Sequence, residues 1–517
     1  MSILNATDIS LNFGGRKILE NATFRLLNGE HVGLVGANGE GKTTFLNIIT
    51  GKLEPEAGSI SWCKRITSGY LDQKMVLPQG TTIRQALKMS FDNLFNLEKE
   101  MLALYEKTAT CLEDEYDTIM EDAGEIGAIL EHSGFYNIDS KIEEYANGLG
   151  LGEIGLDKEV DMLSGGQRSK VLLTKLLLEN PMILILDEPT NFLDEDQIKW
   201  LTNFLKEYEN AFILVSHDIP FLNDVTNVIY HIENAQLTRY TGSYDEFIAA
   251  YELKKQQVEK AYEKQQKEIE SLQTFIAKNK ARASTATLAR SRMKKLEKMD
   301  IIEISKEKIK PTFSFNQART PGRVVISCKD LIIGYDTPLT KPLSLEIERN
   351  KKIAIKGVNG IGKSTLIKSL IGEIKPISGE IEQDQFIEIG YFEQENDGSS
   401  ATALEEVWHL YPSMTNAEVR AALAKCGLTT EHITSQMKVL SGGEAAKVRL
   451  CKLMLSQNNI LVLDEPTNHL DVLAKESLKE AIINFKGTIL LVCHEPEFYE
   501  DVATDIWDVS DWSLKII

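Results

Sequence analysis

One series of short motifs occurs twice along this chain of 517 residues. GANGEGKTT begins at Gly36, and GVNGIGKST begins at Gly357, which is 321 positions later. GYLDQ and GYFEQ end in Gln73 and Gln394, and these glutamines have the same offset. Motifs that keep one spacing indicate duplication of a whole domain, so we expect two copies of a single fold.

The offset changes once along the chain. The serines of the two LSGG motifs, Ser164 and Ser441, lie 277 positions apart, and the glutamates of the two LDEPTN motifs, Glu188 and Glu465, share this offset. The first copy therefore contains 44 additional residues, the difference between the two offsets. Local matching places this insertion at about residues 90–137.

The insertion has a helical pattern and a strong negative charge. Leu94, Leu97 and Met101 recur at helical spacing. From Asp92 to Tyr136 there are 12 acidic residues and 2 lysines, a net charge of −10. Such a segment fits either a solvated helical hairpin or an arm that contacts a basic protein surface.

A long charged segment, residues 243–315, separates the two copies. Residues 246–280 contain no proline or glycine and predict one helix, roughly 50 Å long at 1.5 Å per residue. ARASTAT at 281–287 predicts a turn, and a second helix is expected to begin near Leu288. Residues 278–298 include 8 basic residues and 1 acidic residue, which makes a local basic patch.

The two copies are predicted to be α/β domains. Apolar strands precede each glycine-rich motif (EHVGLVG and KKIAIKG), and MILILD and ILVLD read as strands of a buried parallel sheet. We expect a first domain at 1–242 with an inserted arm, a helical-hairpin linker at 243–315, and a second domain at 316–517.

Composition excludes several classes of protein. No stretch of about 20 apolar residues is present, so we expect no membrane span. The first residues lack a signal-peptide pattern, which indicates a cytoplasmic protein. The formal net charge of −20 argues against broad affinity for nucleic acid. The six cysteines form no C-x-x-C pair, so we expect reduced thiols and neither a disulfide framework nor a zinc site.

GxxxxGK[ST] after an apolar strand predicts a phosphate-binding loop, in which backbone N–H groups and a helix N-terminus hold the phosphates. Lys42 and Lys363 are expected to bind the β- and γ-phosphates, and Thr43 and Ser364 to ligate Mg²⁺. The predicted loop residues are Gly36, Asn38, Gly39, Gly41, Lys42, Thr43 and Thr44 in the first copy and Gly357, Asn359, Gly360, Gly362, Lys363, Ser364 and Thr365 in the second.

Each LDEPTN motif ends an apolar strand with two carboxylates. Asp187 and Asp464 fit an outer hold on Mg²⁺, and Glu188 and Glu465 fit the role of polarising the attacking water. A pair of acids at a strand end also occurs as a helix N-cap. The fixed distance from the phosphate-loop lysine favours the catalytic interpretation.

The LSGG motifs bring serine and glycine N–H groups to a helix start, which makes a second anion site. These residues are Ser164, Gly165, Gly166, Ser441, Gly442 and Gly443. His217 and His494 follow apolar strands at the shared offset and are predicted to contact the γ-phosphate, although a lone histidine there is usually structural. Phe13 and Tyr335 precede the loops and fit either adenine stacking or core packing.

The ordered motif set resembles the ABC ATPase family. That resemblance implies that ATP binds between the phosphate loop of one domain and the LSGG of the other. Site one would combine Lys42, Gln73, Glu188 and His217 with Ser441 and Gly443. Site two would combine Lys363, Gln394, Glu465 and His494 with Ser164 and Gly166. Gln73 and Gln394 would also be metal ligands, and both sites would hydrolyse ATP.

Tandem ABC domains, an arm in the first domain and a linker with a basic tip resemble the ABC-F family. The resemblance implies binding to the ribosomal tRNA exit site, with the linker directed towards P-site tRNA and large-subunit RNA. It also implies a monomer whose two domains pair within the chain. The arm is expected to dock on a basic ribosomal protein. The candidate RNA-binding residues are Lys280, Arg282, Arg290, Arg292, Lys294 and Lys295.

Three alternatives remain open: a ribosome-protecting member that confers antibiotic resistance, the ATPase subunit of a transporter, and a DNA-repair or chromosome ATPase. A housekeeping role in translation is favoured over resistance because the linker turn is short and lacks bulky aromatic side chains. Phe192 occupies the position of His469 in the other copy, which leaves open whether the two sites are equivalent.

Overall fold

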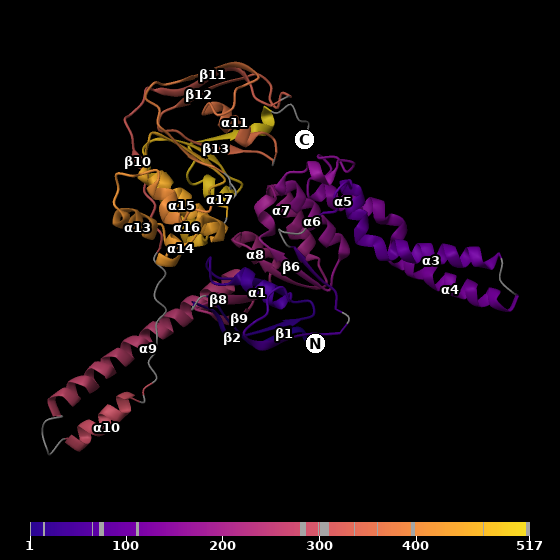
Figure 1. Ribbon diagram of the computed structural model, residues 1–517, viewed down its shortest axis with the longest axis horizontal. Coiled ribbons are helices and arrows are strands. Elements are labelled where there is room, and N and C mark those ends of the chain that lie inside the picture. Colours follow the sequence, from indigo (N-terminus) through magenta and orange to yellow (C-terminus); the bar gives the residue numbers. More distant parts are fainter. Residues whose placement is uncertain are drawn as a thin grey trace.

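The computed structural model describes residues 2–13, 16–64, 66–71, 77–109, 113–279, 286–297, 299, 310–335, 337–358, 360–393, 399–468 and 470–512. Two α/β domains form the body of the molecule, and two helical hairpins project from it in different directions (Figure 1). This arrangement confirms the predicted fold class of two tandem domains with an inserted arm and a helical linker.

The first domain contains two sheets. A three-stranded antiparallel sheet has the order β2-β1-β4, and a six-stranded sheet has the order β5-β6-β7-β3-β8-β9, in which only the edge pair β8 and β9 is antiparallel. The central strands β6 and β7 are almost entirely buried, as expected for a sheet covered on both faces. The strands are β1 (Ser2–Phe13), β2 (Arg16–Leu27), β3 (His31–Val35), β4 (Ala57–Trp62), β5 (Ser68–Leu71), β6 (Ile183–Asp187), β7 (Ala211–Val215), β8 (Val228–Glu233) and β9 (Gln236–Thr241).

The second domain repeats this plan with sheets ordered β12-β11-β14 and β15-β17-β18-β13-β19. The four pairings of the five-stranded sheet are parallel. Its strands, with the small strands β10 and β16, are β10 (Asn316–Gln317), β11 (Val324–Ile332), β12 (Leu343–Glu348), β13 (Lys352–Lys356), β14 (Ser378–Gln383), β15 (Ile389–Phe392), β16 (Gln457–Asn458), β17 (Ile460–Asp464), β18 (Thr488–Val492) and β19 (Asp505–Asp508).

Helices cover these sheets. In the first domain they are α1 (Lys42–Ile49), α2 (Ile83–Lys88), α3 (Asp92–Thr108), α4 (Glu113–His132), α5 (Ile138–Gly148), α6 (Gly165–Glu179), α7 (Glu195–Lys206) and α8 (Ile219–Val225). In the second they are α11 (Lys363–Leu370), α12 (Ala403–Trp408), α13 (Asn416–Lys425), α14 (Thr430–Thr434), α15 (Gly442–Leu455), α16 (Val472–Asn484) and α17 (Pro496–Tyr499). Short 3-10 turns are η1 (Met89–Phe91), η2 (Phe135–Asn137), η3 (Val160–Met162), η4 (Pro189–Phe192), η5 (Met437–Val439) and η6 (Val509–Asp511).

The core fixes helix α1 between the two sheets of the first domain. Phe45 of α1 is fully buried, and its ring meets Phe24 of β2 edge-on at 5.2 Å between centroids. Aromatic pairs of this geometry add to the stabilisation that burial alone provides. The loop that precedes α1 is therefore anchored at both ends, by β3 and by α1.

The arm is the helical hairpin α3–α4, and it confirms the predicted insertion. Its base belongs to the core: Leu130 and Phe135 are buried, and Phe135 packs against Phe95 at 5.2 Å. Its outer part exposes large apolar side chains, among them Leu102 and Tyr105. The arm is thus a surface element that is rooted in the hydrophobic core.

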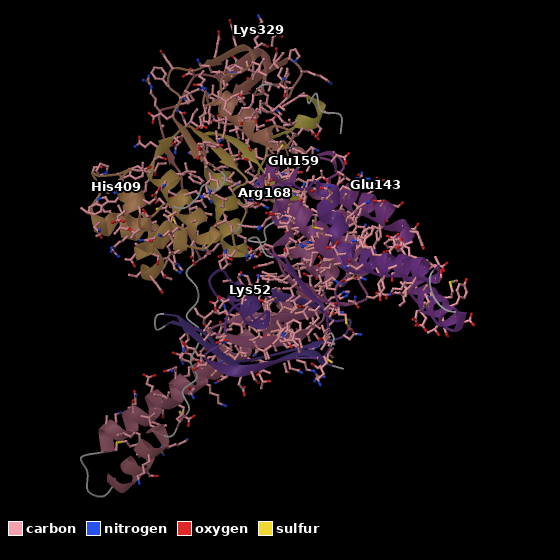
Figure 2. The ribbon with its side chains drawn as sticks, turned by 45° about the vertical axis from the view of Figure 1, so that its right-hand side comes forward. Lys52, Glu143, Glu159, Arg168, Lys329 and His409 are labelled. Carbon is pink, nitrogen blue, oxygen red and sulfur yellow. The ribbon has the colours of Figure 1, made fainter. Side chains whose placement is uncertain are left out.

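The linker is the helical hairpin formed by α9 (Tyr244–Asn279) and α10 (Ala286–Glu297), as its sequence predicts. Arg292 lies over the ring of Phe275 at 4.3 Å, and Lys295 Nζ lies 2.7 Å from Glu268 Oε1. These contacts hold the two helices together. The linker projects away from the body in both views (Figures 1 and 2).

The chain joins the second domain at residues 310–318. Phe313 is buried in the core of that domain, and β10 pairs with β16 in parallel. Phe315 meets Phe485 at 6.1 Å between ring centroids. Phe313 and Phe315 thus pack into the second domain a few residues before residue 316, the start predicted from the sequence. An extended segment of this kind has no periodic pattern of apolar residues that would identify it in the sequence.

Candidate nucleotide-binding sites

Each phosphate loop connects a central strand to a helix start. The first loop lies between β3 and α1 and the second between β13 and α11. Gly41 and Gly362 precede the helices with φ of 99° and 113°, a region that favours glycine. A Cβ on Gly41 would lie 2.6 Å from Ile18 Cγ2, so a side chain there has no room. The sequence places glycine where the backbone must turn and face a ligand.

The loop lysines bend back across their own loops. Lys42 Nζ donates to the carbonyl oxygen of Gly36 at 2.7 Å, and Lys363 Nζ donates to that of Gly357 at 2.6 Å. Both side chains are buried. Burial lowers the pKa of Lys363 to about 8, against the opposing effect of the nearby carboxylates. Each ammonium is thus held over the cradle in which phosphate oxygens would lie.

A hydroxyl and a carboxylate meet beside each loop, as the metal prediction requires. Thr43 Oγ1 donates to Asp187 Oδ2 at 3.0 Å, and the Ser364 hydroxyl bonds to the Asp464 carboxylate. Asp464 Oδ1 is buried and has no hydrogen-bond partner. A buried carboxylate oxygen costs free energy unless it is paired. Hard oxygen ligands of this kind suit Mg²⁺.

The two glutamates share a strained backbone. Glu188 and Glu465 both have φ of 51°, which is rare for a residue with a side chain. Each conformation is fixed by the neighbouring strand, because Glu188 N donates to Val215 O at 2.9 Å and Glu465 N donates to Val492 O at 3.0 Å. Strain that the surrounding structure imposes is typical of functional positions.

The surroundings of the two glutamates differ. Glu188 Oε2 accepts from the His217 backbone N–H at 3.2 Å, while Glu188 Oε1 is buried without a hydrogen-bond partner and lies 3.5 Å from His217 Nε2. Glu465 Oε2 accepts from Asn468 Nδ2 at 2.8 Å, and its Oε1 lies 3.3 Å from His494 Nε2. The carboxylate of the second site is therefore better satisfied.

The pKa values follow this difference. Burial raises the pKa of Glu188 to about 7, although Lys42 opposes the shift. Burial acts in the same direction on Glu465, but His494, Lys363 and Asn468 together bring its pKa below the ordinary value. The histidines also differ in their other contacts: His217 Nε2 lies 2.9 Å from Asn38 Oδ1, and His494 Nε2 lies 3.0 Å from Lys363 Nζ.

The LSGG motifs lie at helix starts, as predicted, and their serines cap these helices. Ser164 caps α6 and Ser441 caps α15, and each hydroxyl oxygen accepts from the backbone N–H three residues later, at 3.3 and 3.4 Å. The glycine N–H groups at both helix starts carry the partial positive charge of the helix dipole. Figure 2 labels Arg168, the fourth residue of α6, near the boundary between the two domains.

Charged groups of the two domains face each other. Lys363 of the second domain interacts electrostatically with Asp194 and Lys170 of the first. Asp471 of the second domain interacts with His217 of the first. A cavity of about 640 Å³ lies between the domains, and its wall includes Glu188, His217, Glu465 and His494. Both sets of catalytic candidates thus border one space.

Comparison with known proteins identifies the family. The sequence model of the family described as ABC transporter matches residues 19–191 and 340–468, and a second model with the same description matches 230–315. "ABC transporter F family member 2" of Arabidopsis thaliana is 33% identical over 98% of this chain and 76% of its own length. This chain belongs to the ABC-F family.

Two further comparisons extend this result. The ABC-F chain is 58% identical to the "Uncharacterized ABC transporter ATP-binding protein YfmM" of Bacillus subtilis (strain 168), over 100% of both chains. The archaeal ribosome recycling factor aABCE1, solved in complex with the ribosomal stalk protein aP1, shares the fold with a TM-score of 0.57. It is 19% identical, over 97% of this chain and 87% of that one. Because the family model and the ABC-F relatives match, this chain is an ATPase that binds ATP. Among the described residues, no helix is long and apolar enough to cross a membrane.

Several predicted site residues lie outside the described part of the ABC-F chain: Gln73, Asn359, Gln394 and His469, with the side chain of Phe13. Tyr335 is 68% exposed, and its loop reaches the phosphate loop, because Leu339 lies 3.4 Å from the position of a Cβ on Gly362. That exposure excludes core packing for Tyr335, and adenine stacking stays a prediction.

Sequence reasoning missed three residues that the structure brings to the sites. They are Asn468, which bonds Glu465, and the aspartates Asp194 and Asp471, which face the opposite domain. All three belong to the repeated LDEPTNxLD segment. The shared offset of 277 was the signal that could have revealed them, since it extends beyond the glutamates.

Proposed function

We propose that this ABC-F ATPase binds the ribosome at the tRNA exit site and modulates translation through its linker. One observation carries the proposal: a hairpin with a basic tip projects from a body that contains two ATP sites, in a chain with a net charge of −20. Concentrated positive charge on a projecting element suits contact with an RNA backbone.

Each site is proposed to bind ATP together with Mg²⁺. Lys42 and Lys363 hold the phosphates, and Thr43 with Asp187 and Ser364 with Asp464 hold the metal. When bound, Mg²⁺ neutralises charge on the phosphate oxygens. Glu188 and Glu465 orient the attacking water, and each site is completed by the LSGG of the opposite domain. Pairing of the two domains within one chain makes the protein a monomer in this proposal.

The linker residues divide into two groups. Arg292 and Lys295 contact the neighbouring helix, whereas the side chain of Lys294 is exposed. The remaining candidates are Lys280, Arg282 and Arg290, whose side chains lie outside the described residues. We assign phosphate contacts of large-subunit RNA or P-site tRNA to Lys294 and these three, and hairpin cohesion to Arg292 and Lys295.

The arm is proposed to contact a basic ribosomal protein. Its net charge of −10 is repelled by RNA phosphates and attracted to basic surfaces. Its exposed apolar side chains, including Leu102 and Tyr105, add area that a protein partner would cover. The aABCE1 structure, which has the same fold, contains a ribosomal protein partner. A cytoplasmic location follows from this proposal.

Co-sedimentation tests the proposed function. Purified protein is centrifuged with ribosomes and, separately, with membrane vesicles from the same cells, at two salt concentrations. We expect the protein in the ribosomal pellet, with less bound at the higher salt because phosphate contacts release counterions. Recovery with vesicles and not with ribosomes would favour the transporter-subunit alternative.

A further inference from the structure

The pseudo-symmetry of the two domains is broken at one charged position beside the sites. Lys475 lies on α16 of the second domain, and the residue 277 positions earlier, on α7 of the first domain, is Ile198. Lys475 pairs with Glu495, and the residue 277 positions before Glu495 is Asp218. Both copies therefore have an acidic residue at this position. The first domain therefore has an acidic residue, Asp218, but an isoleucine, Ile198, in place of the lysine.

Lys475 is held at the wall of the interdomain cavity. Its Nζ lies 2.8 and 2.9 Å from the two carboxylate oxygens of Glu495, and its side chain is 16% exposed. The same cavity wall includes Glu188 and His217 of the first domain. A two-oxygen contact fixes a flexible lysine head in one place, so its charge faces this wall steadily.

The charge of Lys475 reaches across the domain boundary. Lys475 acts to lower the pKa of Glu188 and of Asp218, both in the first domain, while its partner Glu495 acts on Asp218 in the opposite direction. Charged groups of its own domain also act on Glu188: Lys42 at the start of α1 and Asp187 on β6, with His217 after β7 in contact with the carboxylate. Lys475 is thus the cation that the second domain adds to this set.

The carboxylates of Glu188 and Glu465 differ in how fully they are hydrogen-bonded. Glu188 Oε1 is buried and accepts no hydrogen bond, whereas Glu465 is paired with Asn468 at 2.8 Å. A fixed cation near an unsatisfied carboxylate stabilises negative charge that would otherwise be costly in a partly dry site. Lys475 therefore acts on Glu188, the glutamate whose carboxylate has fewer hydrogen bonds.

We propose that Lys475 is a positioning residue for ATP hydrolysis at the first site, contributed by the opposite domain, and that the second site works without a cation at this place. Lys475 comes from the opposite domain and borders the same cavity as Glu188, so in this proposal chemistry at the first site depends on domain pairing through this residue. The inference rests on the proposed role of Glu188 as the residue that orients water.

Single-turnover hydrolysis of bound ATP tests the proposal in the full-length chain. Glu465→Gln confines chemistry to the first site, and Glu188→Gln confines it to the second. In the Glu465→Gln background, we expect Lys475→Ile, which copies Ile198, to slow conversion of ATP to ADP about five- to tenfold. In the Glu188→Gln background the same substitution changes the rate less than about twofold. ATP affinity stays the same in both.

Two controls separate positioning from structure. Lys475→Arg is expected to restore most of the first-site rate, because it returns the charge. Lys479→Ile removes a cation one turn along α16 that bonds Glu497 O at 2.9 Å and does not border the cavity, and it should leave both rates unchanged.

Three results would overturn the proposal: equal slowing at both sites, no slowing at the first, or no conversion at all in the Glu465→Gln background. The double variant Glu188→Gln with Glu465→Gln reports separately on the role of the glutamates. If that double variant still converts ATP, the assignment of Glu188 fails whatever Lys475 does.

Discussion

At the scale of single residues, the phosphate loops depend on backbone conformations that only glycine adopts easily. Gly41 has φ of 99°, and a Cβ at this position would lie 2.6 Å from Ile18 Cγ2. Gly51, at the end of α1, also has positive φ (75°), but nothing lies within 4 Å of its Cβ position. Substitutions at Gly41 and Gly51 therefore distinguish the free-energy cost of a positive φ, which both positions share, from the cost of steric overlap, which only Gly41 has.

We expect Gly41→Ala to weaken ATP binding at the first site at least tenfold and to destabilise the fold by about 2–4 kcal/mol, because strain and overlap add. Gly51→Ala should cost about 1 kcal/mol and leave ATP binding unchanged. Nucleotide titration and thermal unfolding of the two variants measure these effects. Equal losses in both would show that the close contact with Ile18 is unimportant.

The sequence predicted the identity of the catalytic candidates and not their differences. Both copies carry LDEPTN, so Glu188 and Glu465 are indistinguishable by motif. Their hydrogen bonds differ because side-chain contacts depend on small displacements: His217 bonds Asn38, whereas His494 lies next to Lys363. The difference between Phe192 and His469 is a separate matter, because His469 lies outside the described residues.

At the scale of elements, the two hairpins were the most predictable parts of the chain. The linker helix expected at 246–280 is α9, Tyr244–Asn279, because a long stretch without proline or glycine has few competing conformations. The strand β10 was not foreseen, since two residues paired with β16 carry no pattern. The burial of the arm base was also hidden, because the arm carries buried apolar residues (Leu130, Phe135) and exposed ones (Leu102, Tyr105) of similar type.

For the arm, we predict that removing the tip, residues 105–118, weakens ribosome binding several-fold while the thermal midpoint changes little. The base, with buried Leu130 and Phe135, stays in the core. Replacing the five acids of this stretch by their amides, at full length, should reproduce most of the loss if charge is responsible. Binding measured by sedimentation checks both variants, and crosslinks from the tip mainly to ribosomal RNA would contradict a protein partner.

For the linker, we predict that reversing Lys280, Arg282, Arg290 and Lys294 to glutamate abolishes ribosome binding and leaves basal ATPase activity largely intact. Arg292 and Lys295 are kept because they hold the hairpin through Phe275 and Glu268. The matched control reverses four exposed lysines of the body, which are Lys64, Lys329, Lys341 and Lys375. Ribosome binding by the unaltered protein should weaken as the salt concentration rises, because phosphate contacts release counterions. Equal ribosome binding by the linker variant and the control variant would contradict a role for the positive charge of the linker.

At the scale of the whole molecule, the two domains place both sets of catalytic residues around one cavity of about 640 Å³. Asp471 of one domain interacts with His217 of the other, and Lys363 interacts with Asp194. The sequence alone gave no contact between copies; the facing arrangement came from the family resemblance. These features place both ATP sites at the boundary between the two domains.

The most direct test of this account is co-sedimentation of the double variant Glu188→Gln with Glu465→Gln in the presence of ATP. Replacing the carboxylates removes the groups that orient water and leaves the phosphate loops intact, so ATP binds and is not hydrolysed. We predict that the variant remains on ribosomes while the unaltered protein cycles off, with phosphate release at background. Normal ATP turnover by the variant, or equal partition of both proteins between ribosomes and supernatant, would contradict the account.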